Sequence, residues 1–415
     1  MLAEPVCVKQ TTKPAQLMSE TQDIDVEVSS DALFNKRILV GISGGIAVVD
    51  SVRVLRELRR HGAIPIVIMT HSAQEIISPL AIEWASQSEV ITDWDSDMTQ
   101  LSNVDAVLVC PATRHTISSH VHGIMDTPLQ MALSASRGRN TPILFVPSMH
   151  GSLSQDPVTS DLCSNLEKQG HDVLWGASQE GRKKQPDASE IIAELCHIVN
   201  SKLPDRKRIV ITLGSTRSKI DAVRWIQNTS SGKTGFEIAE YLYRMGHEVT
   251  ICSGVTTHPS PSANIPTIFR PEPEEMLSAL MEISQKEAKT DCWIHAAAVL
   301  DYVVGEPISE KTKSGLDGIN VKLINSSKHI EALSQTCANS IRIGFKLESG
   351  ISDEQLIEAA SDSLATYGLD AVVANHLESL EISGARAFWV TSATQSIELN
   401  DNYAIAKIID ARLSQ

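Results

Sequence analysis

The sequence predicts an α/β protein with two doubly wound parallel-sheet domains, the first flavodoxin-like or Rossmann-like and the second Rossmann-like. Short apolar runs of strand length alternate with segments of helical period, which is typical of parallel sheets covered by helices. Hydrophobic residues make up 42% of the 415 residues and aromatic residues only 4%, as expected for aliphatic strands buried on both faces. This length accommodates two or three domains.

The first domain is predicted to span residues 37–200. It opens with an apolar strand, Arg37 to Ile42, followed by a glycine turn at residues 43–47 and a helix at residues 48–62 whose apolar side chains recur at helical spacing. A further helical stretch is predicted at residues 118–135. The remaining strands are predicted at residues 63–70, 104–113 and 141–149.

The second domain is predicted to span residues 208–415, after a charged linker at residues 201–207. A helix is expected from Phe236 to Met245. Residues 1–36 are polar and show no clear apolar period, so they are predicted to be a mobile tail. The strands of the second domain are predicted at residues 209–213, 248–253, 292–299, 341–346, 369–375 and 387–391.

The net charge excludes some classes of binding partner, and the cysteine content indicates the cellular compartment. The net charge of −15 argues against a nucleic-acid backbone or an anionic membrane as the main partner. The longest apolar runs are too short to cross a membrane, and the N-terminus lacks the hydrophobic region of a signal peptide. Seven scattered cysteines without a C-x-x-C pair indicate reduced thiols. We therefore expect a soluble, cytoplasmic protein.

Small and hydroxyl-bearing residues follow three predicted strands of the first domain, where ligands of such sheets bind. They are Ser43, Gly44, Gly45, Thr70, Ser72, Pro111, Ala112 and Thr113. The glycines miss the dinucleotide spacing Gly-x-Gly-x-x-Gly, and the second strand ends without the acidic residue that holds a ribose. A monophosphate such as that of FMN therefore suits these residues better than the nicotinamide cofactor of a reductase.

In the second domain, residues 228–235 join a predicted strand to a helix start. Ser231, Gly232 and Lys233 offer a hydroxyl, a flexible backbone and a charge, which an anion needs at a helix N-terminus. The spacing of a Walker motif is absent. By itself, the segment predicts either an anion site or a polar helix cap.

Longer motifs in both halves resemble a known family. Residues 41–47, 70–73, 111–128 and 146–150 look like the flavin-binding decarboxylases that act on phosphopantothenoylcysteine. Residues 212–235 resemble the signature of phosphopantothenate–cysteine ligases, and so do residues 297–302, 344–349 and 369–375. Order and fusion are similar to the bifunctional enzyme of coenzyme A biosynthesis, in its archaeal form.

The resemblance implies a ligase reaction through an acyl-nucleotide. Asn228 matches the asparagine that holds this intermediate, and Lys311 matches a lysine near the triphosphate. The family positions that contact the nucleotide match a further set of residues: Ser231, Gly232, Lys233, His295, Ala296, Ala297, Asp301 and Phe345. The implied substrates are phosphopantothenate, cysteine and CTP or ATP, with Mg²⁺ as the metal. No metal ligand is assigned.

Two departures concern the nucleotide. Two lysines of the bacterial ligase fall at Ser363 and Tyr367 in this chain, and residues 326–330 replace a bacterial Asn-Pro-Asp-Ile run. These differences leave the choice between CTP and ATP open.

A third departure concerns decarboxylation. The alignment places Asp97 where the family has its catalytic histidine. Two alternatives follow. Either Asp97 is an unusual catalytic base, or the first domain is a flavin-binding module that no longer decarboxylates and that serves oligomerisation or regulation. FMN is the implied cofactor in both cases, and the family implies a homo-oligomer.

Overall fold

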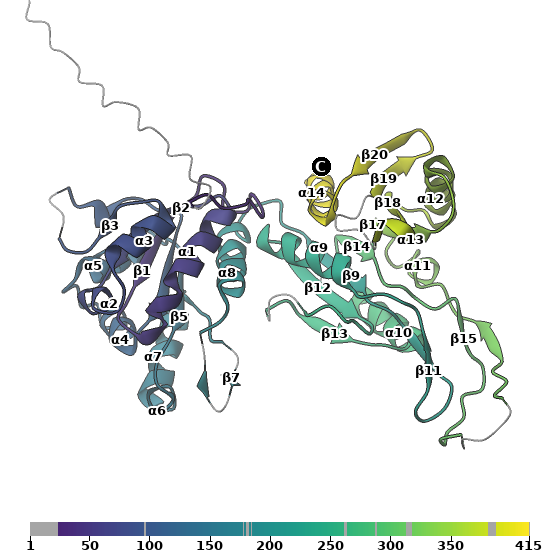
Figure 1. Cartoon of the computed structure of the whole chain (residues 1–415), viewed down its shortest axis with the longest axis horizontal. Coiled ribbons are helices and arrows are strands. Elements are labelled where there is room, and N and C mark those ends of the chain that lie inside the picture. Colours follow the sequence, from purple (N-terminus) through teal and green to yellow (C-terminus); the bar gives the residue numbers. More distant parts are fainter. Residues whose placement is uncertain are drawn as a thin grey trace, which may run out of the picture.

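The computed structural model describes residues 24–94, 97–176, 185–260, 264–286, 289–312, 318–380 and 387–414, together with the backbone of residues 178–179 and 182–183. Within this part of the chain, the two predicted α/β domains lie side by side (Figure 1).

The first domain is built on a six-stranded sheet in the order β3-β2-β1-β4-β5-β6, and every pairing is parallel. Alternate residues of β1 face opposite layers: Ile38 and Val40 enter one core cluster and Leu39 enters another. This alternation follows from the two-residue period of a strand. The strands are β1 (Arg37–Ile42), β2 (Ile64–Met69), β3 (Val90–Ile91), β4 (Ala106–Ala112), β5 (Ile143–Pro147) and β6 (Asp172–Val173).

Helices cover both faces of this sheet. The core cluster on one face contains residues of α1, α3 and α8, and the cluster on the other face contains residues of α4, α5 and α7. The predicted helix at residues 118–135 is in fact two helices, since Thr127 caps a new helix with Pro128 as its first residue. Proline suits that position because the first helical N–H has no intrahelical partner. The helices are α1 (Ser51–Arg60), α2 (His71–Gln74), α3 (Pro79–Ser86), α4 (Arg114–Val121), α5 (Pro128–Gly138), α6 (Gly151–Ser154), α7 (Pro157–Lys168) and α8 (Ala188–Asn200), with the 3-10 helices η1 (Ile46–Asp50) and η2 (Thr99–Leu101) and the small hairpin β7 (Ser178–Gln179) and β8 (Arg182–Lys183).

The second domain contains an eight-stranded sheet in the order β13-β12-β9-β14-β17-β18-β19-β20. The first six strands are parallel, as predicted, but β19 and β20 pair antiparallel at the edge. The sheet is therefore mixed, and a two-residue turn, Ala393 and Thr394, joins β19 to β20 where a parallel strand would need a crossover. Its strands are β9 (Arg208–Leu213), β12 (Glu248–Ser253), β13 (Thr267–Phe269), β14 (Cys292–His295), β17 (Ile341–Glu348), β18 (Ala371–His376), β19 (Ala387–Ser392) and β20 (Gln395–Leu399).

Helices of the second domain also lie on both faces of the sheet. Helices α9 and α14 share one core cluster, while α10 and α12 belong to two other clusters. Two small hairpins, β10–β11 and β15–β16, extend away from the sheet (Figure 1). The elements are α9 (Lys233–Arg244), α10 (Pro273–Ser284), α11 (His329–Ala332), α12 (Asp353–Tyr367), α13 (Leu377–Leu380), α14 (Asn402–Leu413), β10 (Arg217–Lys219), β11 (Trp225–Gln227), β15 (Tyr302–Val304) and β16 (Leu323–Asn325).

The end of the predicted N-terminal tail is part of the folded domain. Ala32 and Leu33 are buried in the first core, and the Ser30 hydroxyl lies 2.6 Å from Nδ1 of buried His61. The prediction of a tail up to residue 36 was wrong for residues 30–36, because two apolar side chains are too few to show a period in the sequence. Residues 1–23 lie outside the described residues.

Two further expectations concern thiols and membranes. The six cysteines among the described residues are buried thiols, and burial raises the pKa of the Cys110 thiol well above its usual range. Within the same residues, no helix combines the length and the apolar character needed to cross a membrane.

Candidate functional site

The predicted cofactor residues of the first domain meet where the strand order reverses, between β1 and β4. The Ser43 hydroxyl donates to the Pro111 carbonyl at 2.7 Å and accepts from the Thr113 N–H at 2.8 Å. A crevice at such a switch point is where open α/β sheets bind ligands. The Ala112 side chain, by contrast, is fully buried in the core, so only its backbone is available at this edge.

The residues that follow β2 pack tightly against the glycine turn at residues 43–47. A Cβ placed on Gly44 would lie 2.5 Å from the Ser72 side chain, so only glycine fits there. The Thr70 hydroxyl is buried and has no hydrogen-bond partner among the described residues. An orphaned hydroxyl beside a tight glycine turn suits an oxygen-rich anion such as a flavin's phosphate.

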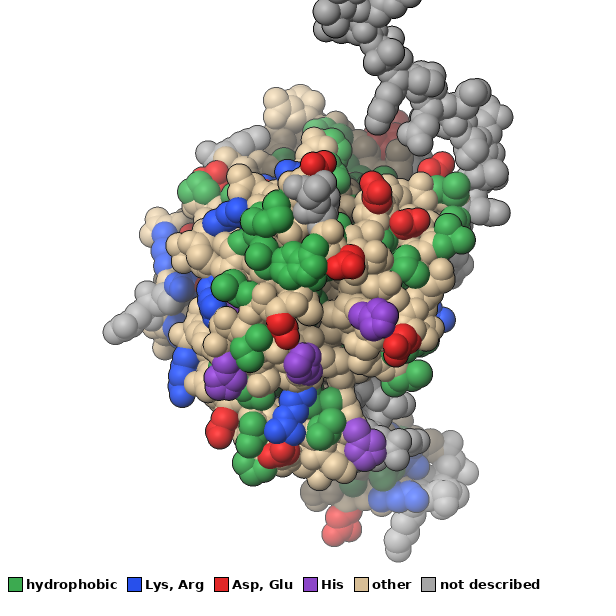
Figure 2. All heavy atoms as spheres, turned by 90° about the vertical axis from the view of Figure 1, so that its left-hand side faces the viewer, with side chains coloured by type: hydrophobic (Ala, Val, Ile, Leu, Met, Phe, Trp, Pro, Cys, Tyr) green, Lys and Arg blue, Asp and Glu red, His purple; other side chains and the backbone are tan. Residues whose placement is uncertain are grey.

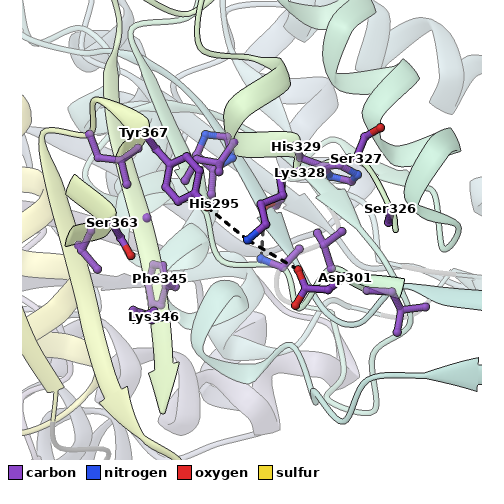
Figure 3. Close-up of a pocket in the computed structure, with 18 residues that line it drawn as sticks. His295, Asp301, Ser326, Ser327, Lys328, His329, Phe345, Lys346, Ser363 and Tyr367 are labelled. Carbon is purple, nitrogen blue, oxygen red and sulfur yellow. Dashed lines mark hydrogen bonds and ion pairs between the residues drawn. The ribbon is translucent and has the colours of Figure 1, made fainter. Parts of the chain in front are cut away.

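The second domain contains a cavity of about 240 Å³ at the carboxyl end of its parallel strands (Figure 3). It lies beside the switch point between β9 and β14, where the Ala297 N–H donates to the Thr212 hydroxyl at 3.3 Å. The residues lining it are Thr212, His295, Ala297, Val299, Leu300, Asp301, Ser326, Ser327, Lys328, His329, Ile330, Gly344, Phe345, Lys346, Ser363, Tyr367, Leu369 and Val372.

Four predicted nucleotide residues line this cavity: His295, Ala297, Asp301 and Phe345. Burial, together with nearby Arg342, lowers the pKa of His295 to about 3. The imidazole is therefore neutral at physiological pH, and its buried Nε2 has no partner within the described residues. A neutral ring nitrogen can exchange one hydrogen bond with a bound polar group.

A charged cluster crosses one side of the cavity. The Lys328 ammonium lies 3.3 Å from the Tyr367 hydroxyl and 4.0 Å from an Asp301 carboxylate oxygen (Figure 3). The hydrogen bond with Tyr367 and the nearby Asp301 raise the pKa of Lys328. This cavity wall therefore carries a fixed positive charge that the sequence did not single out as a site residue.

Asn228 is joined to the wall of the same cavity. Its amide donates to the carbonyls of Val299 at 3.1 Å and Ala298 at 3.3 Å. Because Val299 lines the cavity, the structure brings Asn228 close to the residues predicted for the nucleotide.

The rest of the predicted anion loop takes a tight path into α9. Gly232 has a φ of +78°, and a Cβ there would lie 2.7 Å from Thr256. The Ser231 carbonyl accepts hydrogen bonds from the backbone N–H groups of Thr257 and His258. Lys233, the first residue of α9, is 58% exposed and 3.8 Å from Glu237. Ala296 packs against the core.

Lys311 lies on a separate loop and does not line the cavity. This loop is anchored by Asp221, a fully buried carboxylate that accepts hydrogen bonds from the N–H groups of Thr312 and Val223 and pairs with Arg224. These bonds hold the pKa of Asp221 well below its usual range, with the Val223 N–H as the main cause. Residues 313–317 lie outside the described residues.

Asp97 is exposed in the segment between β3 and η2. The two residues before it, 95 and 96, lie outside the described residues.

The sequence missed several residues that line the cavity, among them Thr212 and Lys328. Thr212 lies in a buried strand and could be found only through its place at the switch point. Lys328 lies in a charged, irregular segment, where an isolated lysine carries no signal of its own.

Comparisons with known proteins agree with both halves of the site. The family model described as the DNA/pantothenate metabolism flavoprotein C-terminal domain matches residues 205–413, and the one described as Flavoprotein matches residues 27–215. The chain is 35% identical to the coenzyme A biosynthesis bifunctional protein CoaBC of Thermococcus kodakarensis, over 84% of this chain and 87% of that protein.

Two further matches are a second curated relative and a solved structure. The CoaBC protein of Borreliella burgdorferi is 31% identical over 83% of this chain and 90% of its own length. A crystal structure of the C-terminal domain of a CoaBC protein is 26% identical, with a TM-score of 0.42, and covers 52% of this chain and 96% of that domain.

Proposed function

Because the chain belongs to the family of bifunctional coenzyme A biosynthesis proteins, we propose that it joins 4′-phosphopantothenate to cysteine and then decarboxylates the product to 4′-phosphopantetheine. Membership confirms the resemblance found in the sequence. The second domain is the proposed ligase, and the first domain is the proposed flavin-dependent decarboxylase.

The cavity of the second domain is the observation that carries the ligase proposal. It combines Asp301, His295 and Phe345 with a lysine, next to Asn228. An aromatic ring, a neutral imidazole and a cation are the groups that a nucleoside triphosphate needs for its base and its phosphates. We propose CTP or ATP as the nucleotide.

In the proposed first step, a carboxylate oxygen of phosphopantothenate attacks the α-phosphorus of the nucleotide. This forms an acyl-nucleotide and releases pyrophosphate. In the second step, the cysteine amine attacks the acyl carbon, loses a proton and expels the nucleoside monophosphate. Asn228 is proposed to hold the acyl-nucleotide in place, and the cations around the phosphates stabilise the charge that develops in these steps.

Mg²⁺ is proposed to enter with the nucleotide. Among the described residues, no group of three or more histidine, cysteine or acidic side chains is arranged to hold a metal ion. Magnesium commonly binds through substrate phosphates with only one or two carboxylates from the protein. Asp301, whose side chain is 72% exposed, is the carboxylate that we propose for this contact.

In the first domain, FMN is the proposed cofactor, held by Ser43, Gly44, Thr70, Ser72 and Thr113. The turn and the Thr70 hydroxyl would bind its phosphate. A flavin supplies the oxidation of the thiol that must precede loss of carbon dioxide. Pro111 and Ala112 shape this edge through their backbone.

Assaying the purified wild-type protein tests both halves. Flavin absorbance is expected, and phosphopantothenate, cysteine, Mg²⁺ and either CTP or ATP should give an amide and then carbon dioxide. No amide with either nucleotide would refute the ligase. Amide without carbon dioxide would support the second candidate, a ligase fused to a silent flavin module, which the exposed position of Asp97 favours.

Asn228→Ala should leave the fold intact and lower kcat for amide formation by about a hundredfold, because a reacting group displaced by about 1 Å loses on this scale. Asn165→Ala, on α7 of the other domain, is the matched control and should ligate normally. Near-normal ligation by the Asn228 variant, measured as pyrophosphate release, would remove the proposed role.

A homo-oligomer is the proposed assembly. Figure 2 shows hydrophobic side chains gathered on the outer face of the first domain. In this domain, Leu80 and Trp84 of α3 are 72% and 41% exposed. Large exposed apolar residues in a cluster commonly mark an interaction surface. Analytical ultracentrifugation should show more than one copy, and Leu80→Glu should lower the mass; a monomeric wild type would contradict the proposal.

A further inference from the structure

Lys328 is placed by three separate elements of the second domain. It is the residue before α11, Tyr367 is the last residue of α12, and Asp301 precedes β15. The ammonium is 3.3 Å from the Tyr367 hydroxyl and 5.8 Å from the centre of its ring. All three side chains face the same cavity (Figure 3).

The lysine retains bonding capacity in this position. An ammonium has three donors, and within the described residues one of them is directed to Tyr367. The 4.0 Å separation from Asp301 is longer than a hydrogen bond. Its side chain is 53% exposed, so a ligand in the cavity can reach it.

The other lysine of the cavity is differently engaged. The Lys346 ammonium lies 2.8 Å from the Glu348 carboxylate, which offsets its charge. Helix α12 contributes Ser363 and Tyr367 to the cavity lining, one helical turn apart, and neither is charged. Of the two lysines that line this cavity, Lys328 is therefore the one whose ammonium has no carboxylate within hydrogen-bonding distance among the described residues.

Building on the proposed function, we propose that Lys328 binds a phosphate group of the nucleotide in this cavity and that Tyr367 is its positioning residue. The ammonium stands beside the Asp301 carboxylate and so reduces the repulsion between that carboxylate and an incoming phosphate. A phosphate oxygen on the remaining donors forms a charge-assisted hydrogen bond, which is stronger than a neutral one. The Tyr367 hydroxyl keeps the flexible side chain on this wall.

Binding measurements by calorimetry on Lys328→Met test the contact directly. The probes are CTP or ATP, whichever binds wild type more tightly, and the corresponding nucleoside monophosphate and nucleoside. We expect about a tenfold to hundredfold loss of affinity for the triphosphate, because a hydrogen bond to a charged group is lost, and an unchanged affinity for the nucleoside. KM for the nucleotide should rise in parallel, while KM for phosphopantothenate stays within about twofold.

Lys407→Met is the matched control. Lys407 is also held by a carboxylate and a tyrosine, at 3.0 Å from Asp31 and 5.8 Å from the ring of Tyr403. It lies on α14, outside the cavity. This variant should bind and turn over the nucleotide as wild type does.

Tyr367→Phe tests the positioning role. It keeps the ring but removes the hydroxyl, so KM for the nucleotide should rise about threefold to tenfold with little change in kcat or melting temperature. In the Lys328→Met background the same change should add nothing, since its target is gone. Additive losses would show that the hydroxyl acts independently of the lysine.

Three results separate the possible failures. Equal losses for the triphosphate and the nucleoside would show that Lys328 shapes the cavity and binds no phosphate. A raised KM for phosphopantothenate alone would assign the lysine to that substrate's phosphate and overturn the proposal. A wild-type protein that never ligates would refute the proposed function. Calorimetry would still show whether Lys328 binds a phosphate group of the nucleotide, because it measures binding and needs no turnover.

Discussion

At the scale of single residues, the most unusual buried pair is His120 and His171 in the first domain. Their Nε2 atoms lie 3.1 Å apart, and the side chains are 0% and 6% exposed. Both rings pack against Phe145. At this distance one neutral ring must donate and the other accept. A first proton added to the pair therefore buries a charge, and a second one also breaks the hydrogen bond, because both Nε2 atoms would then be donors.

We expect this pair to make the protein sensitive to acid. Burial, with nearby His171 and Arg137, lowers the pKa of His120 to about 3, and burial lowers that of His171 to about 4. In the unfolded chain, both histidines titrate near the ordinary value of about 6.5. Below that pH only the unfolded state takes up protons, so the free energy of unfolding falls as pH falls, by on the order of 4 kcal/mol between pH 7 and 5 for the two histidines together.

Urea unfolding of wild type and His171→Gln at the two pH values measures this effect. Glutamine keeps a hydrogen-bonding partner for His120 but does not titrate. Carboxylates common to both proteins cancel in the comparison. The variant should lose a clear part of the pH dependence, and identical slopes in both proteins would show that the pair is not responsible.

A second residue-scale prediction concerns Gly232 at the start of α9. Its φ of +78° suits glycine, and a Cβ there would meet Thr256 at 2.7 Å. Gly232→Ala should lower the free energy of unfolding by about 1–3 kcal/mol and also impair ligation, because the loop from Asn228 must shift. Gly350→Ala, with a φ of +68° but open space around the Cβ, carries the backbone cost alone and serves as the control for thermal unfolding.

At the scale of elements, the sequence predicted the buried strands well and the exposed ones poorly. Strands β1, β2, β9 and β12 are continuous aliphatic runs, and their predicted bounds agree with the structure within about one or two residues. The hairpins β10–β11 and β15–β16 were missed because their strands are only three residues long and are at most half-buried apart from Val304, so no apolar alternation marks them. Strand β14 ends at His295 instead of residue 299.

The candidate site shows the same division. The resemblance pointed to Asn228, His295 and Asp301, and the structure brings these residues to one cavity. It could not point to Lys328, whose contribution depends on how α11, α12 and the residues before β15 pack together. Such a convergence of three elements has no signature in local spacing.

Asp221 gives the first hairpin of the second domain a testable role. It lies between β10 and β11, and its carboxylate holds both Arg224 and the backbone of Thr312, next to Lys311. We expect Asp221→Asn to loosen the Lys311 loop and to lower kcat/KM for the nucleotide by about tenfold or more, since a charge-assisted hydrogen bond to the loop is weakened.

The control for this variant is Asp401→Asn. Asp401 also accepts a backbone N–H, at the start of α14, but stands far along the chain from the site. Asparagine caps helices about as well as aspartate, so ligation should be unchanged. If Asp221→Asn ligates at the wild-type rate, the contact between this hairpin and the Lys311 loop does not contribute to ligation.

At the scale of the whole molecule, the two domains are joined by more than the linker. Helix α8 of the first domain packs on α9 of the second, where the rings of His197 and Tyr243 stack at 4.0 Å with an angle of 1° between their planes. The Tyr243 hydroxyl donates to Glu194 at 2.8 Å. The Asn200 amide donates at 2.8 Å to a carbonyl on each side, those of Ala32 and Arg244.

These contacts should restrain residues 201–207, which contain three trypsin sites at Lys202, Arg206 and Lys207. His197→Ala removes the stacked ring and its hydrogen bond to the Tyr243 carbonyl while leaving Tyr243 in the core of the second domain. We expect trypsin to cleave this linker several times faster in the variant, because local opening costs less free energy.

His122→Ala, at an exposed position of the first domain, is the control and should be cut at the wild-type rate. Ligation by His197→Ala should be unaffected even as cleavage accelerates, if the ligase half releases its product before the decarboxylase half acts on it. Equal rates of cleavage in both variants would show that the stacked pair does not hold the domains together.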